Sequence, residues 1–169
     1  AAKHLSNPDS TKAGIIGAGI QAKLQLEALT LVRNIDTAFI WARNSEKVNQ
    51  LINEVSKLNI NFQICSSTEE VVKHSEIVVT TTPSKSFLIK NEWLKKGLHI
   101  TAMGSDAEQK NELHPNMIKL CDNYIPDSQA QTTILGELHH AIKENLISSD
   151  DKFNDLGSIV LIFVFIILF

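Results

Sequence analysis

The chain has few cysteines and no excess of basic residues. Its two cysteines, Cys65 and Cys121, lie in apolar runs without C-x-x-C spacing, which indicates buried, reduced thiols rather than a disulfide framework. The formal net charge of the 169 residues is −3, and the lysines and arginines form no basic stripe. This charge balance argues against a nucleic-acid partner.

Signatures of metal binding and of acyl transfer are also missing. His139 and His140 are adjacent, and neighbours on a helix point about 100° apart, so the pair does not readily share one ion. Ser84 and Ser105 lack the G-x-S-x-G setting of a nucleophilic serine. We therefore expect neither a metal centre nor a serine hydrolase.

The N-terminus carries neither an initiator methionine nor a signal-peptide pattern. We expect a cytoplasmic protein with no membrane partner. Ala1 to Leu5 read as the end of a helix already under way, and 7–10 as a turn. We therefore expect residues 1–10 to finish a helix that belongs to a missing N-terminal domain.

A short apolar run, Ala13 to Ile16, predicts a buried strand that ends in Gly17-Ala18-Gly19 and leads into a helical pattern from Ile20. Strand, glycine turn and helix form the context of a dinucleotide-binding motif. Gly17 suits the tight turn, Gly19 the close approach of a pyrophosphate, and Ala22 close packing of the helix. The alternative is a purely structural turn in another α/β protein.

Strands and helices alternate along residues 11–148, which predicts a doubly wound parallel sheet of the Rossmann type, with six strands in the order 3-2-1-4-5-6. A last helix is expected from about Ala130 to Asn145, and residues 149–158 read as a linker. The expected strands are 13–16, 37–41, 61–65, 76–80, 98–103 and 118–124.

The end of the second strand bears on the choice between NAD(H) and NADP(H). NAD sites usually have an acidic residue there, but this strand is followed by Arg43, Asn44 and Ser45. An arginine suits a 2′-phosphate, so we predict NADP(H) over NAD(H), with Asn44 and Ser45 as hydrogen-bond partners. Ser45 is also the expected N-cap of the next helix. The alternative is that Arg43 is a solvated surface residue.

The last residues, 159–169, are eleven apolar residues without a break. This run is about half of the roughly 20 residues needed to span a bilayer. Three interpretations stay open: a core strand without partners, a truncated membrane anchor, and a non-native reading frame after a break in the coding sequence. We favour the third.

Several stretches stand out together by their order and spacing: Gly14-Ile-Ile-Gly-Ala-Gly-Ile-Gln-Ala22, Ile40-Trp-Ala-Arg-Asn44, Thr80-Thr-Thr-Pro-Ser84, Trp93-Leu-Lys-Lys-Gly97, His99-Ile-Thr-Ala-Met-Gly-Ser-Asp106 and Lys110-Asn-Glu-Leu113. Over residues 1 to about 158, this order and spacing resemble the ornithine cyclodeaminase/mu-crystallin family. The version with Met103-Gly-Ser-Asp106 is most similar to the cyclodeaminase homologues of ectoine utilisation.

The resemblance implies an NAD(P)(H) site. The corner at Ala42, Arg43 and Asn44 would contact the adenosine 2′-phosphate. Two further groups would touch the cofactor: the glycine turn, with Gly17, Ala18, Gly19, Ile20, Gln21 and Ala22, and the segments with Thr81, Thr82, Pro83, Met103 and Gly104.

The resemblance also implies a catalytic role for Asp106, which would face the substrate amine and take part in proton transfer. A carboxylate near the nicotinamide can take the proton of an amine that is being oxidised. From turn preferences alone, a turn or cap residue after Gly104 is the favoured interpretation of Asp106, whereas the resemblance favours catalysis. Lys110 matches a family lysine, but Gln109 departs from the family's glycine.

The implied reactions are hydride transfers on an amino acid or a cyclic imine: cyclising deamination, imine reduction or oxidative deamination, that is, lyase or oxidoreductase chemistry. The resemblance implies an N-terminal domain with a substrate-binding arginine and the homodimer interface, and we expect this domain to be missing ahead of Ala1. We expect the chain alone to be catalytically inactive. The alternatives are a non-catalytic NADP(H)-binding protein like the crystallin relatives, and a truncated inactive product.

Overall fold

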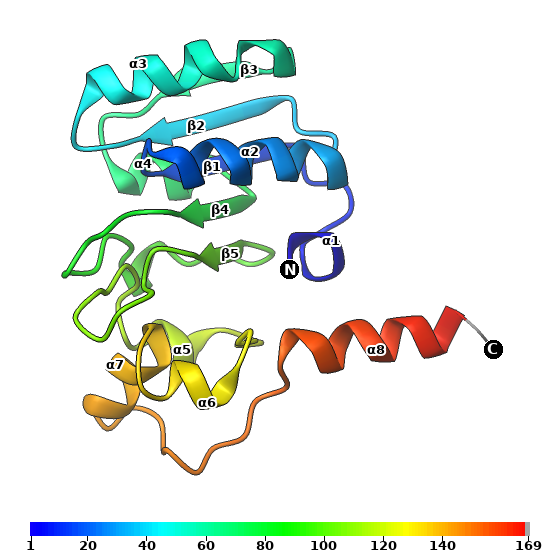
Figure 1. The fold of residues 1–169 in the computed structure, drawn as a ribbon, viewed down its shortest axis with the longest axis vertical. Helices are drawn as coiled ribbons and strands as arrows, with labels where there is room; N and C mark the ends of the chain where they lie inside the picture. The colour runs from blue at the N-terminus through cyan, green and yellow to red at the C-terminus, as the bar shows by residue number, and fades with distance from the viewer. Residues whose placement is uncertain (168–169) are drawn as a thin grey trace.

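A five-stranded parallel sheet forms the centre of the computed structural model. The structure describes the backbone of residues 1–167 and the side chains of residues 1–161. The strand order is β3-β2-β1-β4-β5 (Figure 1), which confirms the predicted Rossmann-type architecture. The strands are β1 Lys12–Ile16, β2 Thr37–Trp41, β3 Asn61–Ile64, β4 Ile77–Thr80 and β5 His99–Ala102.

α-Helices connect β1 to β2, β2 to β3 and β3 to β4, whereas the crossover from β4 to β5 contains only a short 3₁₀ turn. The helices within the sheet region are α2 Ile20–Val32, α3 Ser45–Glu54 and α4 Thr68–His74, with short 3₁₀ turns at Ser56–Leu58 and Asn91–Trp93. The remaining helices are α1 Ala2–Leu5, α5 Met117–Leu120, α6 Gln129–Thr132, α7 Glu137–Lys143 and α8 Leu156–Ile167.

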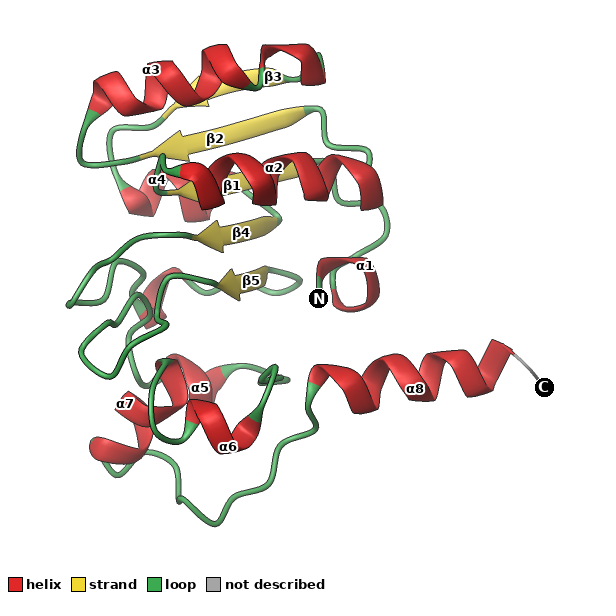
Figure 2. Ribbon diagram, in the orientation of Figure 1, coloured by secondary structure: helices red, strands yellow, loops and turns green. Residues whose placement is uncertain are grey.

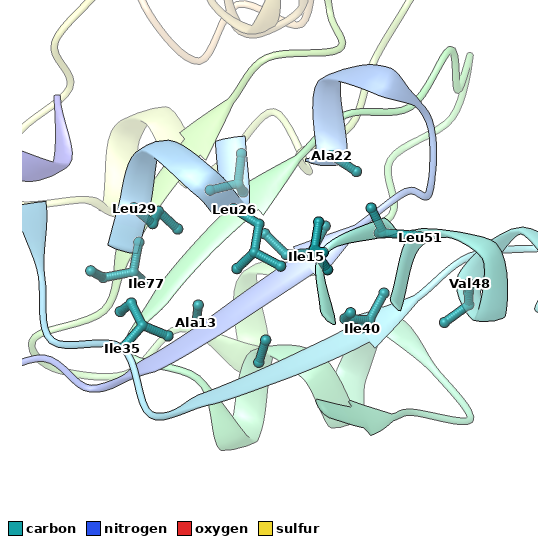
Figure 3. Close-up of a cluster of buried hydrophobic side chains, with 13 residues drawn as sticks. Ala13, Ile15, Ala22, Leu26, Leu29, Ile35, Ile40, Val48, Leu51 and Ile77 are labelled. Atoms are coloured by element: carbon teal, nitrogen blue, oxygen red, sulfur yellow. The ribbon is translucent and has the colours of Figure 1, made fainter. Parts of the chain in front are cut away.

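Both faces of the sheet are buried at its central strands β1 and β4, whose successive residues point to opposite sides. Ile15 lies in one apolar cluster with Leu26 of α2 and Leu51 of α3, and Figure 3 shows this cluster between the two helices and the strands. Ile16 lies in a second cluster with Val72 of α4. Helices therefore cover both faces, and the sheet is doubly wound.

The predicted sixth strand, residues 118–124, is wrong. Residues Met117–Leu120 form α5, and the chain then continues as a loop. Met117 and Ile118 are both buried while Lys119 and Leu120 are exposed, so adjacent side chains share one face, as on a helix and not on a strand. Among the described residues, the sheet ends at β5.

The prediction of one continuous last helix from Ala130 to Asn145 is also wrong. It consists of α6 and α7, separated by a turn that ends at Gly136. Gly136 has a φ of 90°, a backbone conformation outside the right-handed helical region. The break places Glu137 at the start of a new helix, where its carboxyl group is buried.

The two ends of the chain are helical where the structure describes them. Arg33 fixes α1, since its Nη2 donates to the carbonyl oxygens of Ala2, Lys3 and Ser6 at 2.8–3.1 Å. α8 begins inside the expected linker, and its backbone is helical through Ile167, so the core-strand interpretation of residues 159–169 is wrong over that range; 168–169 lie outside the described residues. Within the described part, no helix is long and apolar enough to cross a membrane.

Candidate functional site

The glycine turn lies at the carboxyl end of β1, at the centre of the sheet. The N–H of Gly17 donates to the Trp41 carbonyl oxygen at 2.8 Å, which ties the turn to the end of β2. Gly17 has a φ of 121°, and a Cβ there would lie 2.5 Å from Thr81 Oγ1. The turn therefore requires glycine at this position for both backbone conformation and space.

Gly19 differs from Gly17 in what surrounds it. Its φ is −98°, it is exposed, and a Cβ built on it would meet no heavy atom within 4 Å. Neither strain nor internal packing accounts for glycine here, whereas the close approach of a pyrophosphate would. Ile20 and Gln21 form the exposed first turn of α2, and Ala22 is fully buried, as close packing of helix on sheet predicts.

An open pocket lies beside this turn. It is formed by the turn and by the face of α3 that lies opposite it, with Ala18, Gly19, Ile20, Lys47, Gln50, Leu51 and Glu54 as lining residues. One wall carries the free N–H groups at the start of α2, and helix N-termini favour anions. A phosphate group therefore fits this position.

The corner after β2 is exposed at Arg43, Asn44 and Ser45. Asn44, and not Ser45 as expected, is the N-cap of α3, because Asn44 Oδ1 accepts from the N–H of Glu46 at 2.9 Å and of Lys47 at 3.3 Å. Ser45 is the first helical residue. Of the three side chains predicted to bind the 2′-phosphate, the Asn44 oxygen is thus already engaged.

The segments after β4 and β5 meet at the same edge as the glycine turn (Figure 2). Thr81 Oγ1 donates to the Ile16 carbonyl oxygen at 3.3 Å, and the Met103 N–H donates to the Thr80 carbonyl oxygen at 2.9 Å. Thr82 and Gly104 are half-buried, whereas Pro83 and Met103 are exposed. The structure thus brings these predicted residues to one edge of the sheet.

Glu112 joins Thr82 to Gly104, a role that was not predicted from the sequence, although Glu112 lies in the stretch Lys110-Asn-Glu-Leu113 that contributes to the family resemblance. Its side chain is fully buried. Oε1 accepts from the Thr82 N–H at 2.6 Å and the Thr82 hydroxyl at 2.7 Å. Oε2 accepts from the Thr80 hydroxyl at 2.6 Å and the Gly104 N–H at 2.8 Å. One carboxylate therefore holds the ends of β4 and β5 together.

A second buried carboxyl group, on Glu137 of α7, holds the segment that carries Glu112. Its oxygens accept from the Glu112 N–H at 2.8 Å, the Leu113 N–H at 3.2 Å and Asn111 Nδ2 at 3.0 Å. Burial raises the pKa of Glu137 to about 7, against the lowering effect of these backbone donors and with a smaller raising effect of Glu112. Neutral or charged, the group remains an acceptor for this segment.

Asp106, the predicted catalytic residue, lies in the loop after β5. Its side chain is 70% exposed and forms an ion pair with Lys110. The loop is closed at its base, because the Lys110 carbonyl oxygen contacts Ser105 Oγ at 2.6 Å and His140 Nε2 at 2.7 Å. Asp106 thus stands at the same edge as Thr82 and Gly104, open to a ligand. Arg43 lies across the sheet, because β1 and β4 separate β2 from β5.

Comparison with known proteins agrees with this geometry. The family model described as "Ornithine cyclodeaminase/mu-crystallin family" matches residues 1–161. An uncharacterized cyclodeaminase of Sinorhizobium fredii is 51% identical over 162 residues, which are 95% of this chain and 49% of the relative.

Two solved structures extend the likeness to the fold. The Δ(1)-pyrroline-2-carboxylate reductase of Thermococcus litoralis, in complex with NADH and L-proline, has a TM-score of 0.83 at 31% identity, over 88% of this chain and 46% of that one. An archaeal alanine dehydrogenase dimer with bound NAD has a TM-score of 0.88 at 30% identity, over 95% and 49%. The chain thus spans about half the length of these relatives.

Proposed function

We propose that this chain, which belongs to the ornithine cyclodeaminase/mu-crystallin family, is the NAD(P)(H)-binding domain of an enzyme that transfers hydride to or from a small amino acid or cyclic imine. The observation that carries the proposal is Gly19. It is an exposed glycine without strain or packing demand, at the start of a 13-residue helix and at the central strand of a parallel sheet, where such folds bind dinucleotides.

The residues at the carboxyl edge fit the cofactor in an ordered way. The segment from Gly17 to Ala22 would hold the pyrophosphate at the N-terminus of α2. The corner Arg43–Ser45 would hold the adenosine ribose. The segments Thr81–Pro83 and Met103–Gly104 would lie against the nicotinamide, which is the group that accepts or donates hydride when bound. This division follows the strand order, with β2 and β5 on opposite sides of β1 and β4.

The substrate end of the proposal rests on Asp106. Its carboxylate is largely exposed, and it follows β5 at the edge where the nicotinamide would lie. There it would take a proton from the substrate amine, or in the reverse direction donate a proton to the imine nitrogen. The names of the two solved relatives, an imine reductase and an amino-acid dehydrogenase, support an amino acid or imine as substrate. The dimeric alanine dehydrogenase supports a homodimer for the whole protein.

The proposed preference is for NADP(H) over NAD(H). The described side chains at the corner after β2 include the exposed Arg43 and no carboxylate before Glu46, and Asp36 lies at the opposite end of β2. A guanidinium group recognises a phosphate by paired hydrogen bonds. Both solved relatives above carry NADH or NAD, so the preference is a specific claim about this chain.

Titration of the chain with NADPH and with NADH tests the proposal. We expect tighter binding of NADPH by the wild type, and a loss of this preference in Arg43→Ala. Lys57→Ala is the matched control, because it removes an exposed cation that does not line the pocket and should leave the preference intact. Binding of neither cofactor contradicts the proposed function, whereas tighter NADH binding that Arg43→Ala leaves unchanged contradicts only the preference.

A further inference from the structure

Two carboxyl groups, on Glu112 and Glu137, are buried next to the same segment of the chain. Among the described side chains, neither forms an ion pair with a cation. Glu112 is fully buried and Glu137 is 6% exposed. The ion pairs among the described side chains are Lys23–Glu54, Lys73–Glu69 and Lys110–Asp106. Burial of an unpaired carboxylate is unfavourable unless hydrogen bonds compensate for the lost water. The donors that compensate therefore show what these groups organise.

The donors to Glu112 all belong to the edge where β4 and β5 end. The regular pairing of these strands stops at Thr80 and Ala102, with one more backbone bond from the Met103 N–H to the Thr80 carbonyl oxygen. Beyond it, the N–H groups of Thr82 and Gly104 both point to the Glu112 carboxylate. Glu112 thus continues the connection between the two segments after the strands have ended.

Contact at Gly104 makes this connection tight. A Cβ on Gly104 would lie 2.2 Å from the Thr82 carbonyl oxygen and 2.6 Å from Glu112 Oε1. The spacing of the two segments is therefore set by direct contact as well as by the shared carboxylate. Glu137 in turn fixes the backbone of Glu112 and Leu113 through their N–H groups, so that the Glu112 side chain starts from a fixed position.

We infer that Glu112 is a positioning residue for the nicotinamide half of the cofactor, and that Glu137 orients it. The inference rests on the proposed function, because it takes Thr82 and Gly104 as the walls against which the nicotinamide lies. Glu112 itself is fully buried and acts through these two residues. The adenosine half is held elsewhere, at the glycine turn and the corner after β2, which Glu112 does not contact.

Glu112→Gln is a sharp perturbation because each carboxylate oxygen accepts from a backbone N–H, one from Thr82 and one from Gly104. A glutamine amide has one oxygen and one NH₂ group. Whichever way it turns, one backbone N–H faces another donor and loses its acceptor, and an unsatisfied buried donor is strongly unfavourable. The substitution therefore separates the two segments with no change in side-chain size.

The test compares the whole cofactor with its adenosine half. Affinities are measured for whichever of NADH and NADPH binds more tightly. They are also measured for the matching fragment without nicotinamide, which is ADP for NADH and the 2′-phosphate of ADP for NADPH. For Glu112→Gln, we expect the affinity for the whole cofactor to fall about tenfold, as for loss of one hydrogen bond to a charged group. The affinity for the fragment should stay within about twofold. A role confined to stability would not separate the two ligands.

Two further variants keep the test decisive. Ile35→Ala, in the core just before β2 begins at the amino end of the strands, lowers stability far from this edge and should change neither affinity. Thr80→Val removes one hydroxyl donor to Glu112 Oε2 with little change in shape. By the same reasoning, it should lower the affinity for the whole cofactor about threefold. This variant keeps the test open if Glu112→Gln does not fold.

The outcomes separate this inference from the proposed function. If the wild type binds neither whole cofactor, the proposed function fails. If the wild type binds and the foldable variants at 112 or 80 keep full affinity, or lose whole cofactor and fragment equally, the positioning role of Glu112 is wrong.

Discussion

Replacing Gly19 by alanine should separate folding from cofactor binding. The φ of −98° suits alanine, and no heavy atom lies within 4 Å of the added Cβ. Alanine lowers the conformational entropy of the unfolded chain, which stabilises the folded protein by about 0.4–1 kcal/mol. Alanine is also a poorer N-cap than glycine, which destabilises the folded protein by a similar amount. The two effects nearly cancel, so the free energy of unfolding should change by less than about 1 kcal/mol.

Binding should respond far more strongly to the same methyl group. The Cβ occupies the open space above the N-terminus of α2, through which a pyrophosphate must approach the backbone N–H groups. Hydrogen bonds from such groups to a charged oxygen contribute about 1.5–3 kcal/mol each. Loss of one or two of these hydrogen bonds should lower the affinity for NADH or NADPH at least tenfold.

The assay pairs urea unfolding with cofactor titration on the same preparations. Gly17→Ala is the contrasting variant, because its φ of 121° and the Thr81 Oγ1 atom 2.5 Å from the new Cβ should destabilise the fold by about 2 kcal/mol or more. The reasoning about Gly19 is refuted if Gly19→Ala binds cofactor within twofold of the wild type, or if it unfolds as readily as Gly17→Ala.

Three other perturbations probe the same edge. In the full-length enzyme proposed above, Asp106→Asn should abolish turnover and leave cofactor affinity unchanged, with Glu108→Gln, an exposed neighbour, as the unaffected control; normal turnover of the asparagine variant would refute the catalytic role. Gly104→Ala should cost about 3 kcal/mol or more in urea unfolding, since its Cβ would lie 2.2 Å from the Thr82 carbonyl oxygen, and wild-type stability would show that the two segments are not in contact. Burial raises the pKa of Glu137 from 4.5 to about 7, so between these pH values the folded chain holds a proton that the unfolded chain has released. Wild-type stability should therefore fall by up to about 3 kcal/mol as the pH rises across this window, and Glu137→Gln should flatten that slope; an unchanged slope in the variant would assign the pH dependence to other groups.

Local patterns were sufficient to predict the first five strands. Each βα unit has a short apolar run followed by a helical period, and a parallel sheet requires such crossovers. The run at residues 118–124 is short and apolar too, and at that length periodicity does not distinguish a strand from a helix. Packing decided it, because Met117 and Ile118 share one buried face on α5. Similarly, only the positive φ of Gly136 divides α6 from α7.

The candidate site could be proposed from the sequence where its residues are close together in the chain. Gly17 and Gly19 lie within one turn and Arg43 follows β2, so spacing along the chain is enough to propose all three as cofactor-binding residues. Glu112 is different, because its donors belong to Thr80, Thr82 and Gly104, which lie 8 to 32 residues away. Only the folded sheet brings these groups to one carboxylate. The stretch Lys110-Asn-Glu-Leu113 contributes to the family resemblance, but it does not show which groups Glu112 contacts.

The most direct test of the central claim is a map of the backbone amide signals of the ¹⁵N-labelled chain during titration with NADH or NADPH. The account predicts that the largest shifts fall at the carboxyl edge of the sheet, on Gly17, Gly19, Ile20, Thr82 and Gly104, and that amides at the opposite edge stay in place. Shifts confined to another surface, or none at millimolar cofactor, would contradict it.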